Sequence, residues 1–348
     1  MSLILIKPLP DSPETSARMD DVLRRALADT DCRVVYTADG LTGLAGNKLL
    51  FAVSLDETGM NFEYQRMLAR IRRERALFRG CTAGLIVDSA SPLYSKSTAA
   101  ELTFAANLSG CAFLGRPLVE ATGSLRNFHT QSKIHGTDLH SAYRIAVAEL
   151  LERLKNWSPL PPPGRVLALH ASMRTTSNTL ALWEMVKRNL PETVEIEELN
   201  LRNGTLTDCI GCHYTTCLHF GERGECFYGG PMVEEVFPAV RRCDTLVMLC
   251  ANYNDALSAN LTAFVNRLTS LFRQSRFYDK RIYGLVVSGY SGGDLLAQQL
   301  ISGLNMNKSF YLPPRFVLME TANDKGSLLQ QPGVDARGAE FARAMMSV

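Results

Sequence analysis

Short apolar runs alternate with helical patterns through the second half of the sequence, and this alternation constrains the fold more than any other feature. Two of the runs, TLVMLC and IYGLVV, are apolar throughout, which is typical of strands covered on both faces of a sheet. Regular alternation of strands and helices favours parallel strands. We therefore predict an α/β fold with a doubly wound, parallel, five-stranded sheet. The predicted strands are Val166–Leu169, Val194–Ile196, Thr245–Cys250, Ile282–Val287 and Phe316–Met319.

A flavodoxin-like sheet is the simplest doubly wound arrangement for this length of chain. The first half of the sequence shows a similar but less regular pattern, which predicts a preceding α/β domain of similar plan. A degenerate flavodoxin-like domain is one interpretation of it. Between the halves lies Trp157–Gly164, whose three consecutive prolines suit neither a helix nor a central strand. We predict a first domain over 1–156, a Pro-rich linker over 157–164 and a second domain over 165–348.

Composition excludes several classes of protein. The 348 residues contain 37 Lys and Arg against 35 Asp and Glu, so the net charge of +2 gives no reason to expect a nucleic-acid partner. The sequence has no run of about 18 apolar residues, so we predict no membrane-spanning helix. The nine cysteines are not spaced like a secreted disulfide framework, which indicates a reducing, cytoplasmic setting.

A polar turn follows the first predicted strand of the second domain and leads directly into a helix. It contains Ser172, Arg174, Ser177, Asn178 and Thr179. Free backbone N–H groups and the positive end of the helix dipole make such a turn suitable for a phosphate, and the hydroxyls add further donors. An ordinary helix N-cap is the alternative interpretation, because Ser and Asn are favoured there.

Two further polar loops follow the third and fourth predicted strands. The first contains Asn252, Tyr253 and Asn254, which offer a flat ring and amide groups suited to a planar heterocycle. The second is glycine-rich, which lets the backbone approach a ligand closely. Its residues include Ser288, Gly289, Gly292 and Gly293. Ligands in open α/β sheets bind beyond the carboxyl ends of the strands, where all three loops would lie.

These three loops, in this order, resemble the NAD(P)H-dependent FMN reductase family of flavodoxin-like proteins. The family pattern G-S-x-R-x-x-S-N-T stands here as 171–179, with Ala171 in place of the first glycine, and P-x-Y stands as 251–253, with Ala251 in place of proline. The resemblance implies that the first loop holds the phosphate of FMN and that the other two hold the isoalloxazine ring. It also implies NAD(P)H as electron donor and a homo-oligomer.

Four cysteines lie close together between the second predicted strand and the next helix: Cys209, Cys212, Cys217 and Cys226. Thiolates at such spacings can converge on one metal centre. This motif resembles the iron–sulfur flavoproteins of the same family, which implies a [4Fe–4S] cluster. Zinc and free thiols are the alternatives.

The main hypothesis is thus an FMN-dependent NAD(P)H oxidoreductase that reduces a flavin- or quinone-type acceptor, for which the protein need supply no catalytic acid or base. One alternative is an iron–sulfur flavoprotein that carries electrons to a protein partner. Another is a non-enzymatic module with a metal- or thiol-stabilised loop. The sequence does not distinguish NADH from NADPH.

Overall fold

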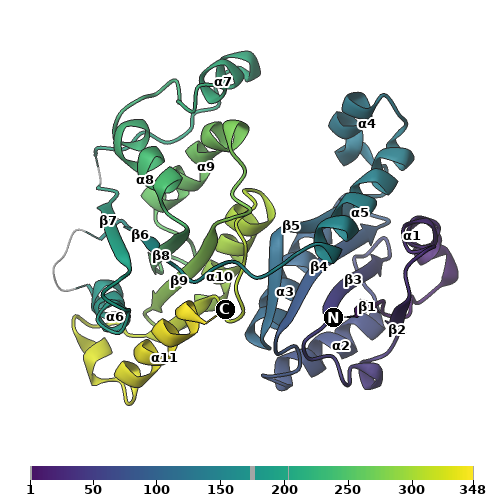
Figure 1. The fold of residues 1–348 in the computed structure, drawn as a ribbon, viewed down its shortest axis with the longest axis horizontal. Coiled ribbons are helices and arrows are strands. Elements are labelled where there is room, and N and C mark those ends of the chain that lie inside the picture. The colour runs from purple at the N-terminus through teal and green to yellow at the C-terminus, as the bar shows by residue number, and fades with distance from the viewer. Residues whose placement is uncertain (1, 173–176, 203, 348) are drawn as a thin grey trace. The chain divides into compact units, whose positions relative to one another are not determined.

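The chain divides into two compact units, each built on its own sheet. The computed structural model describes residues 2–172, 177–202 and 204–347. The first unit comprises residues 1–158 together with 313–315, and the second comprises 159–312 and 316–348. Figure 1 shows the two sheets as separate sets of arrows, each with helices on both sides.

The first unit is a parallel five-stranded sheet in the order β2-β1-β3-β4-β5. Helices α1 and α5 pack on one face of this sheet and α2 and α3 on the other. The strands are β1 (Leu3–Ile6), β2 (Cys32–Val35), β3 (Lys48–Leu55), β4 (Cys81–Ser89) and β5 (Cys111–Ala121). The helices are α1 (Pro13–Ala26), α2 (Phe62–Arg73), α3 (Ser95–Leu108), α4 (His129–His135) and α5 (Leu139–Lys155).

The second unit is also a parallel five-stranded sheet, in the order β7-β6-β8-β9-β10. Counted within each unit, both sheets have the strand order 2-1-3-4-5, which is the flavodoxin-like order. The predicted fold class is therefore confirmed in both halves. The strands are β6 (Arg165–His170), β7 (Glu195–Asn200), β8 (Thr245–Ala251), β9 (Arg281–Ser288) and β10 (Val317–Thr321).

Helices cover both faces of the second sheet. The α-helices are α6 (Asn178–Lys187), α7 (Tyr214–Gly221), α8 (Phe237–Arg242), α9 (Ala259–Gln274), α10 (Gly293–Leu300) and α11 (Val334–Met346). Two π-helical segments, η3 (Met232–Val236) and η4 (Ile301–Met306), precede α8 and extend α10. Helix α6 packs against α11, whereas α9 packs against α7. Trp183 of α6 and Phe264 of α9 are completely buried in the core.

The fourth strands of the two sheets share a short sequence and a packing constraint. Gly84 begins the segment GLIV in β4, and Gly284 begins GLVV in β9. A Cβ at either glycine would lie 2.9 Å from a leucine methyl of a covering helix, Leu150 in α5 or Leu300 in α10. Because protein interiors are close-packed, each helix can lie against its strand only because glycine has no side chain at this position.

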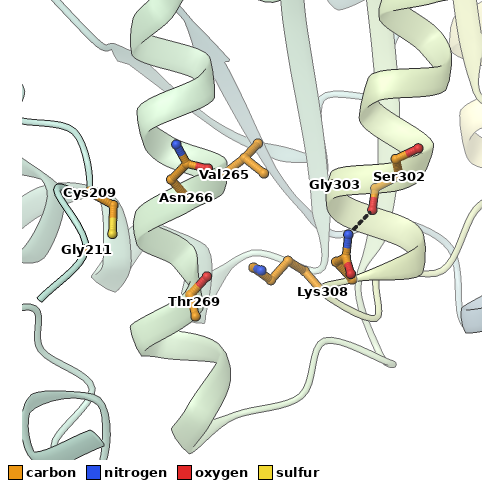
Figure 2. A pocket seen from close by; sticks show the side chains of 9 residues that line it. Cys209, Gly211, Val265, Asn266, Thr269, Ser302, Gly303 and Lys308 are labelled. Atoms are coloured by element: carbon orange, nitrogen blue, oxygen red, sulfur yellow. Dashed lines mark hydrogen bonds between the residues drawn. The ribbon is translucent and has the colours of Figure 1, made fainter. Parts of the chain in front are cut away.

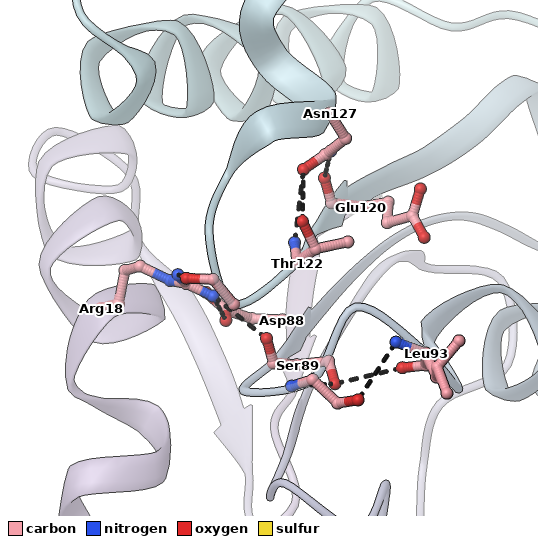
Figure 3. Close-up of polar contacts among 9 residues, drawn as sticks. Arg18, Asp88, Ser89, Leu93, Glu120, Thr122 and Asn127 are labelled. Carbon is pink, nitrogen blue, oxygen red and sulfur yellow. Dashed lines mark hydrogen bonds and ion pairs between the residues drawn. The ribbon is translucent and has the colours of Figure 1, made fainter.

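A buried ion pair ties α1 to the carboxyl end of β4 in the first unit (Figure 3). The Nε of Arg18 donates to Oδ2 of Asp88 at 3.1 Å, and the same guanidinium donates to the carbonyls of Ser89 and Gly123. Burial raises the pKa of Asp88, and its hydrogen bonds with Arg18 oppose that effect. Arg18 thus joins α1 to the ends of both β4 and β5.

We predict that Arg18→Met destabilises the first unit, because it leaves the Asp88 carboxylate buried without its cation. The expected loss in free energy of unfolding is about 3 kcal/mol, as for other buried pairs that lose one partner. Urea denaturation of the full chain measures it. The double variant R18M/D88L should recover much of the loss, since it removes the uncompensated charge as well. Equal stability of R18M and the wild type would contradict this assignment.

Candidate functional site

Three loops of the second unit meet at one edge of its sheet. Strand β6 pairs with β8, and β8 pairs with β9, all in parallel. The loops that follow these strands therefore leave the sheet at the same carboxyl edge, side by side. The described residues of these loops are 171, 172 and 177 in the first, 252–258 in the second and 289–292 in the third, and they contain most of the residues predicted from the sequence to bind a ligand.

The first loop leads from β6 into the N-terminus of α6. The N–H of Ser172 donates to Nδ1 of His170 at 3.3 Å, and the carbonyl of Ser172 accepts from Asn200 at 2.9 Å. Ser177 is the N-cap of α6, where its Oγ accepts from the N–H of Leu180. The N-cap interpretation of Ser177 is thus correct. Arg174, predicted to bind phosphate, lies outside the described residues.

The side chain of Asn178 makes its hydrogen bonds with the segment after β10 rather than within the first loop. Its amide nitrogen donates to the carbonyls of Ala322, at 3.3 Å, and Asp324, at 2.8 Å. Its amide oxygen accepts from the N–H of Gly326 at 3.0 Å. Asn178 therefore fixes the segment after β10 to the start of α6. Thr179, the next residue, is buried in the first turn of that helix.

The second loop contains a tight turn at its tip. Tyr253 and Ala256 exchange two backbone hydrogen bonds, of 3.2 and 3.1 Å. Between them Asn254 and Asp255 have positive φ angles of 52° and 61°, as in a type I′ turn, which Asn and Asp tolerate. The turn holds the Tyr253 ring out from the sheet, with 57 % of the residue's surface exposed.

Asn252 connects the second loop to the third. Its amide nitrogen lies 3.2 Å from Ser288 Oγ and 3.0 Å from the carbonyl of Ser291, and its oxygen accepts from the N–H of Asp255 at 2.8 Å. Like Asn178, Asn252 uses its amide to hold neighbouring loops together. The sequence pattern revealed the position of both side chains but not these contacts.

Glycine is required at Gly292, where the third loop enters α10. Its φ angle is +82°, and a Cβ there would lie 2.2 Å from Asp255 Oδ1. Only glycine combines that backbone conformation with this close approach. At Gly289 a Cβ would lie 2.9 Å from Asn323 Oδ1, whereas Gly293 has ordinary contacts. Tyr290 is 80 % exposed and accepts a hydrogen bond from Asn323 at 3.2 Å.

The chemistry of this edge fits a phosphorylated aromatic ligand. The Ser172 hydroxyl, the backbone N–H groups in the first turn of α6 and the adjacent helix dipole suit a phosphate. Two exposed tyrosine rings, Tyr253 and Tyr290, and the glycine-rich backbone lie on the neighbouring loops and suit a flat ring.

The four-cysteine segment follows β7 and is held by α9. Arg267, of which only 2 % is exposed, donates to the carbonyl of Thr207 at 3.1 Å and to that of Gly229 at 2.7 Å. These two carbonyls lie just before Cys209 and just after Cys226. The neighbouring Asn266 donates to Asp208 at 3.1 Å. One buried guanidinium thus ties together both ends of the segment, a role that no sequence motif predicted.

The four cysteines have free thiols, and Cys209 is exposed while the other three are partly exposed. Burial, and then the neighbouring Cys217, raise the pKa of the Cys212 thiol. Within the described parts of the chain, no group of three or more His, Cys, Asp or Glu side chains is arranged to hold a metal ion. Cys209 and Cys226 also lie close enough to Cys212 to raise its pKa further. The predicted metal site is not confirmed.

Comparison with known proteins agrees with the resemblance in the three loops. Residues 164–324 match the model of the family described as NADPH-dependent FMN reductase. No curated protein matches the chain. This match lies within the second unit and covers somewhat less than half of the chain.

Three solved structures are similar to about half of this chain at low identity. Smu.1420 from Streptococcus mutans is 12% identical, with a TM-score of 0.41, over 51% of this chain and 98% of that one. An FMN-dependent NADH-azoreductase from Bacillus anthracis is 13% identical, with a TM-score of 0.36, over 53% and 100%. An NAD(P)H:quinone oxidoreductase from Methanothermobacter marburgensis is 16% identical, with a TM-score of 0.38, over 52% and 93%.

We predict that His170 makes the chain less stable in acid. Burial lowers the pKa of His170, so the folded imidazole resists protonation more than the unfolded one. Below the unfolded value, about 6.5, the unfolded chain binds more protons and stability falls until the folded pKa is passed. His170→Asn keeps an acceptor for the Ser172 N–H without titrating. In urea denaturation, the wild type should lose more stability than H170N between about pH 7.5 and 5.5. Equal losses would contradict the prediction.

We also predict that Arg267→Met loosens the four-cysteine segment. Each hydrogen bond from the guanidinium contributes about 1.5–3 kcal/mol, so its loss makes local opening more frequent. Alkylation followed by peptide mass spectrometry should show faster labelling of Cys212, Cys217 and Cys226. The exposed Arg343 of α11 provides the matched control, R343M. Unchanged labelling rates in a folded R267M protein would show that Arg267 does not hold the segment.

Proposed function

We propose that this chain is an FMN-dependent NAD(P)H oxidoreductase whose flavin lies on the carboxyl edge of β6, β8 and β9. The observation that carries the proposal is that three loops meet at this edge. One loop has groups suited to a phosphate, and the other two carry exposed tyrosine rings and a glycine-rich backbone that a ligand can approach closely. The family of the second unit supports the same cofactor and electron donor.

The first loop would hold the FMN phosphate. Ser172 would donate its hydroxyl, and Ser177 and Thr179 would contribute through the first turn of α6, with Arg174 as the neighbouring cation. Asn178 acts differently, because its amide is engaged with the segment after β10. We assign Asn178 to positioning the loop rather than to contacting the phosphate.

The second and third loops would hold the isoalloxazine ring. Tyr253 and Asn254 lie in the turn that projects from β8. Ser288 ends β9, Gly289 and Gly292 lie at the two ends of the third loop, and Gly293 begins α10. Asn252 keeps these two loops in register through its contacts with Ser288 and Ser291. FMN, when bound, accepts a hydride from the nicotinamide and passes electrons to an acceptor. The protein binds and orients the flavin and excludes water around it.

The predictions about the electron acceptor, the oligomeric state and the cellular location rest on the sequence alone. A flavin- or quinone-type acceptor, a homo-oligomer and a cytoplasmic location stay predictions. None of the described helices has the length and apolar character needed to cross a bilayer. The electron-carrier alternative depends on an iron–sulfur cluster, for which the described residues show no metal site, and it stays a prediction from the sequence.

Ser172→Ala tests the phosphate assignment. Loss of one hydrogen bond to a charged group costs about 1.5–3 kcal/mol, so the Kd for FMN should rise roughly tenfold or more. Quenching of FMN fluorescence on titration with protein measures the Kd. Ser275→Ala, at the C-terminal end of α9, is the matched control and should bind FMN like the wild type. If S172A binds FMN as tightly as S275A, the phosphate does not lie on the first loop.

A further inference from the structure

Two cysteines of the four-cysteine segment occupy matched positions at the start of helix α7. His213 is the N-cap residue of this helix, and its carbonyl accepts from the N–H of Cys217 at 3.0 Å. Cys212 therefore stands immediately before the N-cap, and Cys217 is the fourth helical residue. Side chains at these two positions commonly pack against each other, in the arrangement called a hydrophobic staple. The register of α7 thus places the two thiols side by side.

The side chains themselves agree with this register. The thiols of Cys212 and Cys217 lie within hydrogen-bond reach of each other. Gly211, immediately before Cys212, has a φ of +73°, a left-handed conformation that favours glycine and turns the chain into the helix. Both cysteines have free thiols, and both are partly exposed. They form an adjacent pair that solvent can reach.

Helix α9 holds the Cys217 end of the pair in place. A Cβ at Gly221 would lie 2.7 Å from Arg273 Cδ and 3.0 Å from the carbonyl oxygen of Ser270, so glycine allows α7 to lie close to α9. The guanidinium carbon of Arg273 lies 4.9 Å from the centroid of the Tyr214 ring. The same guanidinium is within hydrogen-bond reach of the Cys217 sulfur. A side chain that is already held loses little freedom when it forms a new bond.

The chain just before Cys212 borders an open space. A cavity of about 570 Å³ lies over α9, and Cys209 and Gly211 form part of its lining (Figure 2). Its volume is in the range of small-molecule sites, so a small reagent can approach the segment from this side. Cys209 thus borders the cavity, whereas Cys212 is not among the described residues that line it. This difference favours Cys217 over Cys209 as the partner of Cys212.

We propose that Cys212 and Cys217 form a reversible disulfide, with low-molecular-weight disulfides as the oxidant. One protein thiolate attacks a sulfur of the small disulfide, whose S–S bond breaks and releases one small thiol. The second protein thiol then attacks the mixed disulfide and releases the other. Two protein S–H bonds are replaced by one S–S bond, and two electrons and two protons convert the small disulfide into two thiols.

The new bond would tie the first turn of α7 covalently to the chain that precedes it. Arg267 already holds the two ends of the four-cysteine segment. The disulfide would therefore lock the middle of a segment whose ends are fixed. None of the residues assigned above to FMN takes part, so this inference does not rest on the proposed function.

Peptide mapping of the oxidised full chain tests the proposal. The protein is equilibrated without oxygen at a series of ratios of oxidised to reduced glutathione, and the remaining thiols are blocked by alkylation. Chymotrypsin then cleaves after Tyr214, between the two cysteines, so their disulfide joins two separate peptides. These linked peptides should outnumber glutathione adducts several-fold, because the second thiol attacks within the same molecule. Excess reduced glutathione should separate them again.

Variants of single cysteines assign the pair. Cys212→Ser and Cys217→Ser should each abolish the linked peptides and leave a glutathione adduct on the remaining partner. Cys209→Ser and Cys226→Ser, in the same segment, are the matched controls and should form the linked peptides like the wild type. Only glutathione adducts in the wild type, or linked peptides that persist in C212S or vanish in C209S, would overturn the proposal. Purified protein in which iron or zinc occupies the two thiols would overturn it as well.

Discussion

The parallel pairing of β6 with β8 is the constraint on which the candidate site depends. From Val166↔Thr245 to His170↔Leu249 the two strands run in register, so their loops leave the sheet together. Helix α6, which follows β6, packs with α11, whereas α9, which follows β8, packs with α7. The two helices therefore lie on opposite faces of the sheet. Such a divergence opens a crevice at the carboxyl edge of a doubly wound sheet. The third loop joins this edge because β9 pairs with β8.

Buried or partly buried amides and guanidinium groups then hold the loops in place. Asn178 fixes the start of α6, Asn252 joins the second and third loops, and Arg267 closes the four-cysteine segment. Asn178 and Arg267 each donate to two backbone carbonyls, and Asn252 donates to the carbonyl of Ser291 and lies within hydrogen-bond distance of Ser288 Oγ. These contacts define the path of each loop without occupying its outer surface. Ser172 and the rings of Tyr253 and Tyr290 are thereby left available at the edge.

Much of the fold and the position of the site could be predicted from the sequence, because buried strands are continuous apolar runs and the polar loops follow them. The edge strand β7 was predicted only over Val194–Ile196 but extends to Asn200, since its solvent-facing glutamates interrupt the apolar pattern. The use of Asn178 and Asn252 as loop supports could not be predicted, because it depends on carbonyls distant in sequence.

The central claim is that the edge formed by β6, β8 and β9 binds FMN for electron transfer from a nicotinamide. The most direct measurement is the visible absorption spectrum of the anaerobic protein with stoichiometric FMN, before and after addition of NADPH or NADH. We predict protein-bound flavin bands that bleach on addition of one of these donors. A protein that leaves FMN unbound, or bound flavin that neither donor reduces, would contradict the account.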